Sequence, residues 1–187
     1  MSEDGYKLVT PNDYVACICE GSSELTIINL LLEKECLIFS EDNLLNKSIM
    51  PPKYFRNSAK FSSQYLTMDY HSGRLFVFLI QDRKGITYRI KKPYSDKIEG
   101  PYYFVTAPEI EMLMIHSLNA YNDYKKKSNI SPSEYLCNRL KIKEASLKSH
   151  DFIKDFYGEH DLKAAIITHK SKSKKTKGNL FLADLLA

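Results

Sequence analysis

Hydrophobic residues gather in three short runs that predict the strands of a central sheet. Residues 15–19 (Val-Ala-Cys-Ile-Cys) and 74–80 (Arg-Leu-Phe-Val-Phe-Leu-Ile) are apolar almost throughout, and residues 102–105 (Tyr-Tyr-Phe-Val) form the third run. Continuous apolar runs of this length are typical of parallel strands that are buried on both faces. The pattern therefore predicts a mostly parallel sheet, with residues 74–80 as its central strand.

The first of these runs leads into a predicted helix through a tight turn. Residues 20–23 read Glu-Gly-Ser-Ser, where Gly21 permits a sharp turn and a serine can cap a helix. Residues 24–35 then place apolar side chains three and four positions apart, as the buried face of an amphipathic helix does. A strand, a tight turn and a helix in this order open a β–α unit.

Later helices are predicted by periodicity and by capping signals. We expect one helix to begin at Pro108 and to run through His116. Another begins at residues 131–134, where serine, proline and glutamate form a capping box. Two apolar segments follow, residues 162–167 and residues 180–186, and both are expected to be helical.

The basic residues are concentrated near the C-terminus. The chain of 187 residues has a formal net charge of +4, yet residues 170–177 hold five lysines and no acid, so the rest of the chain carries −1. This segment predicts either contact with nucleic-acid phosphates, through Lys172, Lys174 and Lys175, or a solvated loop. Arg83 and Lys84 are further candidates for nucleic-acid binding.

Composition narrows the class of protein. With 43% hydrophobic residues, the chain can build a core, which excludes a disordered protein. Neither a signal peptide nor an apolar run near the roughly 20 residues of a membrane helix is found. The four cysteines form no Cys-x-x-Cys pair, so we expect no zinc site. These features predict a soluble cytoplasmic protein with no membrane association.

Two acidic residues come directly after predicted strands. Glu20 follows residues 15–19, and Asp82 follows the central strand after one glutamine. In open parallel sheets, the carboxyl ends of the strands line the ligand crevice. Two carboxylates meeting there suit Mg²⁺, which prefers oxygen ligands and activates water at phosphate groups. The alternative is that both acids simply occupy turns.

The histidines and serines of the chain match no metal-binding or catalytic motif. His116 is expected to be a structural residue, and His150, His160 and His169 show no metal-ligand spacing. Residues 20–23 have neither the nucleophile elbow of a serine hydrolase nor the Gly-Lys of a P-loop.

Three segments, in this order, resemble the motifs of Toprim (topoisomerase–primase) domains. Residues 15–24 are similar to the opening motif, a hydrophobic strand that ends in Glu-Gly. Residues 76–84 resemble the second motif, a strand that ends in Asp-x-Asp. Residues 108–116 resemble a segment of the RloB-like proteins, which together with the overcoming-lysogenization-defect nucleases are the most similar branch. The resemblance covers residues 13–120.

The resemblance implies a fold and a division of the chain. The fold class is α/β, a three-layer Rossmann-like Toprim fold with a mostly parallel central sheet and helical C-terminal additions. We expect one domain over residues 1–187. A Toprim-like core occupies residues 13–120, and a helical extension with the basic segment 170–177 occupies residues 121–187.

It also implies site residues and a cofactor. Glu20, Asp82 and Glu111 match catalytic positions, and the metal set is Glu20, Asp82, Glu24 and Glu109, with Mg²⁺ or Mn²⁺ as cofactor. The sequence departs from the family where the second aspartate of Asp-x-Asp is replaced by Lys84, which cannot bind a cation. Glu109 can supply the missing carboxylate, Lys84 can contact a phosphate, or the site is degenerate.

The implied function is metal-dependent cleavage of nucleic-acid phosphodiester bonds, by a nuclease or a nuclease subunit, in a context of phage defence. Nucleic acid is the expected partner, and the resemblance admits an ATPase or another protein partner and an oligomer. The alternative is a catalytically degenerate module that binds a protein partner or nucleic acid. Binding of a single nucleotide is a third option.

Overall fold

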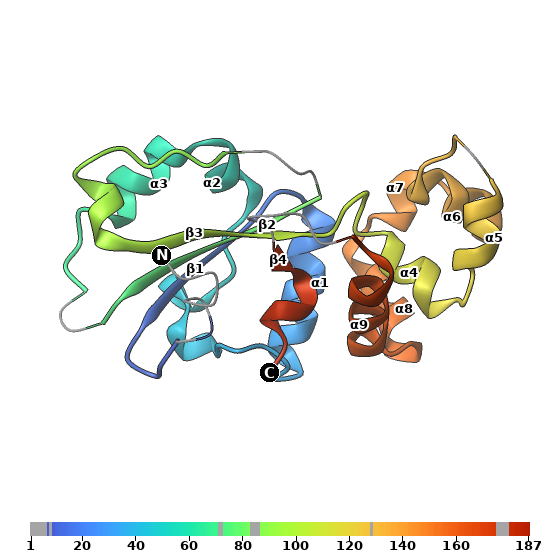
Figure 1. The fold of residues 1–187 in the computed structure, drawn as a ribbon, viewed down its shortest axis with the longest axis horizontal. Helices are drawn as coiled ribbons and strands as arrows, with labels where there is room; N and C mark the ends of the chain where they lie inside the picture. The colour runs from blue at the N-terminus through green and yellow to red at the C-terminus, as the bar shows by residue number, and fades with distance from the viewer. Residues whose placement is uncertain (1–6, 8, 71–72, 83–86, 128, 175–179) are drawn as a thin grey trace.

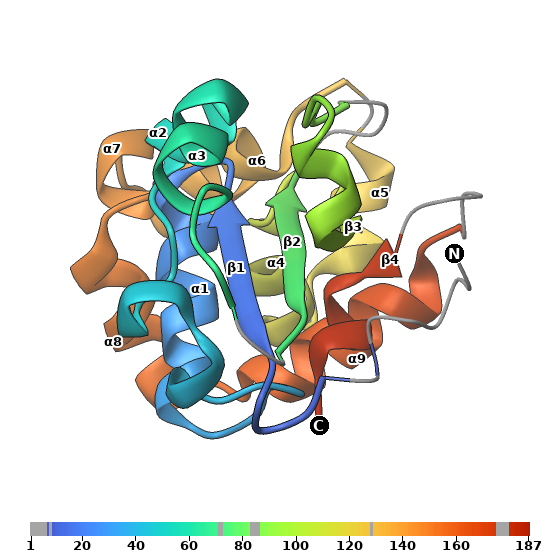
Figure 2. The ribbon, with the colours of Figure 1, turned by 90° about the vertical axis from the view of Figure 1, so that its left-hand side faces the viewer.

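A four-stranded parallel sheet forms the centre of the computed structural model, which describes residues 7, 9–70, 73–82, 87–127, 129–174 and 180–187. The strands lie in the order β1-β2-β3-β4 and pair in parallel, with β2 between β1 and β3 (Figures 1 and 2). Their bounds are Tyr14–Cys19 (β1), Leu75–Gln81 (β2), Ile98–Val105 (β3) and Leu180–Phe181 (β4). The predicted α/β class, the parallel sheet and the central place of residues 74–80 are confirmed.

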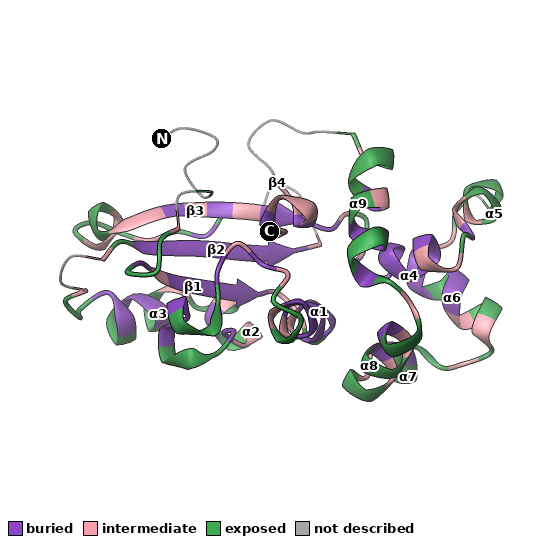
Figure 3. Cartoon of the chain, turned by 90° about the horizontal axis from the view of Figure 1, so that it is seen from below, coloured by how far each residue is buried: buried purple, intermediate pink, exposed green. Residues whose placement is uncertain are grey.

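Successive residues of β1 and β2 alternate between two apolar clusters, one on each face of the sheet. One cluster receives Val15, Cys17, Cys19, Phe76, Phe78 and Ile80. The other receives Ala16, Ile18, Leu75, Val77 and Leu79. Because side chains of a strand point alternately to opposite faces, a strand that is apolar throughout needs cover on both. β2 is accordingly buried along its whole length (Figure 3).

Helices cover both faces and produce three layers (Figure 1). The first cluster is closed by α1 (Ser22–Glu33) and by the 3₁₀ helix η5 (Leu182–Leu185). On the opposite face, α2 (Pro52–Arg56) and α3 (Ser58–Tyr65) contribute Tyr54, Phe61 and Tyr65 to the second cluster. Three more 3₁₀ turns, η2 (Glu41–Asn43), η3 (Leu45–Lys47) and η4 (Tyr94–Lys97), lie in the connections.

The free edge of β1 is covered by the segment that precedes α2. The Met50 N–H donates to the Cys17 carbonyl at 2.8 Å, and the Cys19 N–H donates to the Met50 carbonyl at 3.3 Å. This pairing satisfies backbone groups that an outer strand would otherwise expose. It explains why β1, although first in the strand order, is buried as a central strand would be.

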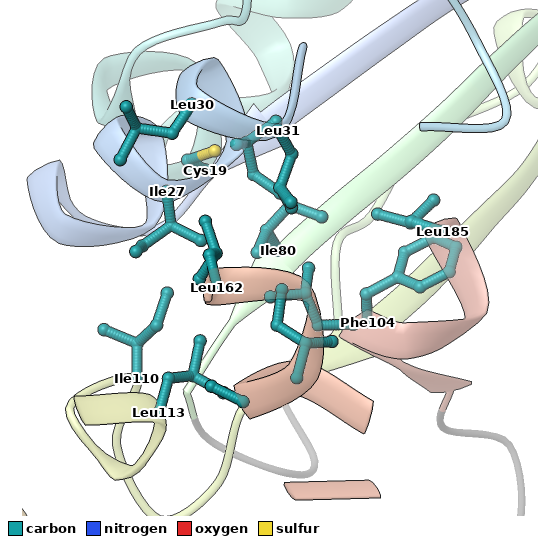
Figure 4. Packing of buried hydrophobic residues seen from close by; sticks show 14 of the residues in the cluster. Cys19, Ile27, Leu30, Leu31, Ile80, Phe104, Ile110, Leu113, Leu162 and Leu185 are labelled. Atoms are coloured by element: carbon teal, nitrogen blue, oxygen red, sulfur yellow. The ribbon is translucent and has the colours of Figure 1, made fainter. Parts of the chain in front are cut away.

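In the part of the chain that the structure describes, six helices follow β3, and they gather beyond the carboxyl ends of the strands (Figures 1 and 3). They are α4 (Met112–Ser117), α5 (Tyr121–Lys126), α6 (Pro132–Leu140), α7 (Glu144–Leu147), α8 (His150–Glu159) and α9 (Leu162–Lys172). Their apolar side chains continue the α1-side cluster, where Leu162 and Leu113 pack with Ile27 and Ile80 (Figure 4). No helix in the described ranges is long and apolar enough to span a membrane.

The capping signal at residues 131–134 is confirmed, whereas the serine cap of α1 is wrong. The Ser131 hydroxyl accepts a hydrogen bond from the Glu134 N–H at 3.1 Å, and α6 begins at Pro132. In α1, the N-cap is Gly21, and no side chain caps it. A carboxylate takes over the first turn of α1 instead, as described below.

Two helix predictions differ from the structure. The helix expected from Pro108 begins only at Met112, because the preceding residues form tight turns in which the Met112 N–H donates to the Glu109 carbonyl. Residues 180–186, expected to be helical, instead begin with β4, which pairs with β3 through Phe104 and Val105. The sheet edge of β3 offers backbone partners that a periodicity pattern cannot show.

Candidate functional site

Glu20 and Asp82 lie side by side where β1 and β2 end. The two strands pair in register up to Cys19 and Ile80, and the Glu20 N–H continues the ladder by donating to the Ile80 carbonyl at 2.9 Å. The Asp82 N–H in turn donates to Glu20 Oε2 at 3.2 Å. The parallel register therefore places these acids together, as their positions after two strands predict.

Glu24 joins them from the first turn of α1. Its side chain is 6% exposed, and its carboxylate accepts a hydrogen bond from its own backbone N–H. The carboxylate also lies over Gly21, where an added Cβ would stand 2.5 Å from Glu24 Oε2. Gly21 thus serves less as a sharp turn than as the space into which this buried acid folds. A carboxylate in this position also complements the positive end of the helix dipole.

Negative neighbours and burial make Glu24 reluctant to ionise. Burial contributes most to raising the pKa of Glu24 from 4.5 to about 7, and the charges of Glu111, Asp82 and Glu20 raise it further. The hydrogen bond from its own N–H acts in the opposite direction. At neutral pH, the Glu24 carboxyl therefore exists in both protonation states.

Glu111 enters this acidic cluster from the turn before α4. It is 5% exposed, and burial raises its pKa, with further increases from Glu109 and Asp82. Its own backbone N–H and the ammonium of Lys148 lower it. Lys148 follows α7, and its charge acts on Glu111. Its pKa is reduced by burial but raised overall, by a 2.6 Å contact with Glu144 and by Glu111 and Glu109.

Glu109 is hydrogen-bonded to the first turn of α6. Its Oε2 accepts a hydrogen bond from the Ser133 N–H at 3.0 Å, in the first turn of α6. One carboxylate oxygen thereby stabilises the start of a helix. Glu109 still lies near enough to Glu111 to affect its ionisation, so it borders the acidic cluster while anchoring α6.

The donor atoms of the four predicted metal ligands suit a hard divalent cation. Glu20, Asp82, Glu24 and Glu109 offer only carboxylate oxygens, which Mg²⁺ and Mn²⁺ accept readily. Over the ranges that the structure describes, no group of three or more His, Cys, Asp or Glu residues is arranged to hold a metal ion. Mg²⁺ sites often use one or two carboxylates, completed by water and substrate phosphate. Glu20 and Asp82 are the pair that fits this simpler arrangement.

The residues expected to contact nucleic acid fall into two groups. Arg83, Lys84 and Lys175 lie outside the described residues. Lys172, at the end of α9, and Lys174 are exposed and border the same cavity, which lies between α4, α5 and α9. The structure thus places two of the predicted lysines at one cavity, whose described lining residues include no acid.

A histidine pair is the feature that the sequence pattern misses. His116 Nε2 and His169 Nδ1 are 3.3 Å apart, and both side chains are buried. His116 lies in α4 and His169 in α9, so 53 positions of sequence separate two rings that are in contact. The sequence pattern carries little signal for this contact, because apolar and polar residues are hardly separated onto different faces of α9.

Comparison of the chain with protein-family models, with curated proteins and with solved structures finds no match. The resemblance to Toprim domains therefore depends on the three sequence segments alone.

Proposed function

We propose that this protein is a Toprim-like, divalent-metal-dependent nuclease, or the nuclease subunit of an assembly, that hydrolyses nucleic-acid phosphodiester bonds. The observation that carries the proposal is the meeting of Glu20 and Asp82 where β1 and β2 end, with the Asp82 N–H donating to Glu20 Oε2 at 3.2 Å. Beside them lies the buried Glu24, whose pKa is raised to about 7 by burial and by the charges of neighbouring acids. A concentration of negative charge at the carboxyl end of a parallel sheet is stabilised by a cation, and this end is where such sheets bind ligands. Perturbed acids in such a place are typical of functional sites.

Each acid has a role that follows from its surroundings. Glu20 and Asp82 would hold Mg²⁺ or Mn²⁺, because they end neighbouring strands and the Asp82 N–H fixes the Glu20 carboxylate. The bound ion would supply an activated water and would neutralise phosphate charge. Glu24, with a pKa of about 7, can give up or accept a proton near neutral pH, as a general acid–base residue must. Glu111 adds negative charge from the turn before α4.

The phage-defence context comes from the resemblance alone. The nucleic-acid substrate is suggested by the resemblance and by the lysines near the C-terminus. The acids would repel a polyanion if no cation were bound, so attraction must come from elsewhere on the chain. Lys172 and Lys174 are exposed and close to each other. The proposal keeps Glu109 as a predicted metal ligand. It keeps Arg83, Lys84 and Lys175 as predicted contacts to nucleic acid, and mutagenesis can test each role.

The test is cleavage of labelled single- and double-stranded DNA and RNA with Mg²⁺ or Mn²⁺. Glu20→Gln should lower the rate at least 100-fold, a typical loss for a residue of the catalytic machinery. The matched control is Glu33→Gln, which changes an exposed acid at the far end of α1 and should leave the rate unchanged. Thermal unfolding of both variants checks the fold. Equal cleavage by the wild type and by Glu20→Gln would overturn the proposal.

A non-catalytic binding module is the second candidate. It is favoured by the lack of a three-residue metal group in the described part of the chain, and by Lys84 where the family has aspartate. Thermal unfolding with and without Mn²⁺ separates the two candidates. A rise in Tm that is present in the wild type and lost in Asp82→Ala supports the nuclease. No rise in either protein, together with no cleavage, supports the module.

A further inference from the structure

A cavity of about 420 Å³ lies where β3 and β4 end and where α4, α5 and α9 meet. Its volume falls within the range of about 300–1,000 Å³ that is usual for small-molecule sites. Val105 and Met112, both buried, contribute apolar surface at its base, and Leu180 contributes a half-buried side chain. Glu20, Glu24, Asp82 and Glu111 are not among its described lining residues. The cavity is thus a separate place from the acidic cluster.

The buried histidine pair provides polar groups without charge. His116 and His169 both line the cavity and lie 3.3 Å apart through Nε2 and Nδ1. Burial lowers the pKa of both rings. For His116, burial acts together with the charges of His169 and Lys172 to give a pKa of about 4. Both rings are therefore neutral at pH 7, and each offers one donor and one acceptor. Ser173 Oγ lies 3.4 Å from His169 Nε2 and extends this polar set.

Aromatic side chains form the walls. Tyr121, Tyr124 and Phe181 are half-buried and line the cavity from α5 and from β4. The His116 ring is stacked on Tyr121, with ring centroids 5.1 Å apart and 29° between the planes. Half-buried rings in a cavity wall offer surface on which a planar ring can pack. Nucleobases use such surfaces, because every base has a flat face that stacks on an aromatic side chain.

Lysines form the rim of the cavity. Lys125, Lys172 and Lys174 are exposed, and the Nζ atoms of Lys125 and Lys172 lie 5.6 and 4.9 Å from the Tyr121 ring centroid. Among the described residues that line the cavity, none is acidic. Three ammonium groups beside an aromatic wall therefore lack a negative partner within the cavity, and an anionic ligand complements them.

We propose that this cavity binds a nucleoside phosphate, with its base against Phe181 and its phosphate at Lys172 and Lys174. An anion without a ring would leave the aromatic walls unused. An uncharged ring would leave the lysines unused. A free nucleotide and a nucleotide within a nucleic-acid strand share the chemistry that the cavity recognises.

A short turn links the cavity to the acidic cluster. Ala107 and Pro108 line the cavity, and Glu111 belongs to the cluster three residues after Pro108. Because consecutive Cα atoms are about 3.8 Å apart, the two positions lie within about 11 Å. A strand held by the cavity would accordingly pass close to the acids. This placement of a strand rests on the proposed nuclease function, whereas binding of a nucleoside phosphate does not.

Isothermal titration calorimetry in EDTA tests the cavity without metal and without cleavage. The probes are the four nucleoside 5′-monophosphates, inorganic phosphate and adenosine. At least one monophosphate should saturate a single site and bind at least tenfold more tightly than inorganic phosphate or adenosine. The double variant Lys172→Glu/Lys174→Glu, and separately Phe181→Leu, should weaken this binding at least tenfold. The control Lys60→Glu/Lys154→Glu makes the same charge change at exposed lysines of α3 and α8 and should not.

A 5′-phosphorylated single-stranded hexanucleotide then distinguishes the two sources of the ligand. Tighter binding of the hexanucleotide than of the monophosphates indicates a strand, and weaker binding indicates a free nucleotide. Thermal unfolding confirms that each variant folds. The proposal is overturned if no monophosphate or hexanucleotide binds, if inorganic phosphate binds as tightly, or if the two double variants bind equally. Nucleotide binding without any cleavage would overturn only the nuclease, and cleavage without nucleotide binding would overturn only the cavity.

Discussion

The two ends of β1 each hold a buried acid, and their surroundings are opposite. Asp13, just before β1, accepts hydrogen bonds from Arg74 Nη2 at 2.7 Å and from the Thr10 N–H and hydroxyl at 2.8 Å each. Burial alone would raise the pKa of Asp13, yet the Arg74 side chain and these donors hold it well below its usual range. Beyond the other end, Glu24 is equally buried, but the charges that act on it are those of other acids, and its pKa rises to about 7.

Asp13 stabilises the fold through its own hydrogen bonds, whereas Glu20, Glu24 and Asp82 are acids whose charges a bound cation can stabilise. Asp13 ties the start of β1 to the start of β2, because the Arg74 N–H also donates to it at 3.0 Å. Glu24, Glu20 and Asp82 place like charges together at the end where parallel sheets bind their ligands. Like charges in one place reduce stability, and proteins often retain such strain at functional sites. We infer that the amino end of β1 serves stability and the carboxyl end serves chemistry.

The largest predicted effect is on stability at the amino end. Asp13→Ala should reduce the free energy of unfolding by about 3 kcal/mol, because the donors of Arg74 and Thr10 lose their buried acceptor. Chemical denaturation measures this change. Asp42→Ala removes an acid whose partner is Lys47 in an exposed pair and should leave stability unchanged. An equal loss of unfolding free energy in Asp13→Ala and Asp42→Ala would contradict a special role of Asp13 in stability.

The next effect is a gain in stability at the carboxyl end. The pKa of Glu24 is about 7 in the folded chain against 4.5 as the ordinary value, so the folded state binds more protons between these values. Stability should then fall as pH rises from 4.5 to 7, by as much as about 3 kcal/mol. Glu24→Gln should remove this fall and exceed the wild type in stability at pH 8.

The control for this gain is Glu33→Gln, which should follow the wild type at every pH. Denaturation curves from pH 4 to pH 8 provide the measurement. If Glu24→Gln is the less stable protein at pH 8, the acids at the carboxyl end are complemented in the same way as Asp13.

The smallest effect concerns the space over Gly21. Gly21→Ala would place a Cβ 2.5 Å from Glu24 Oε2, which forces the carboxylate outward and should cost about 1 kcal/mol at pH 5. Because an outward carboxylate is better solvated, the fall in stability with pH should become shallower. Gly158→Ala in α8, where an added Cβ meets nothing within 4 Å, should be stabilising by up to about 1 kcal/mol. Destabilisation by both variants would contradict this role for Gly21.

The sequence predicts most of the sheet and the first two acids of the site. Continuous apolar runs identify β1 and β2 because strands buried on both faces leave no polar positions. The proximity of Glu20 and Asp82 could also be predicted, because neighbouring parallel strands place the residues after their carboxyl ends side by side. The capping signal at residues 131–134 is equally local, and it too is confirmed.

What the sequence does not predict depends on long-range contacts. β4 forms because β3 has a free edge, and Lys148 approaches Glu111 only through the packing of the C-terminal helices. His116 and His169 meet because α4 packs on α9. The predicted start of α4 at Pro108 is four residues too early, because the residues before Met112 form tight turns. None of these contacts leaves a periodic pattern in the chain.

The most direct test of the account is a carboxyl NMR titration of Glu24, followed with and without Mg²⁺. The account predicts a pKa of about 7 without the cation. With Mg²⁺ bound among the acids, the pKa of Glu24 should fall by at least one unit, and the same addition should leave Asp13 unmoved. A Glu24 carboxyl that titrates at its ordinary value of 4.5, and does not respond to Mg²⁺, would contradict the claim that the carboxyl end of the sheet is built for a cation.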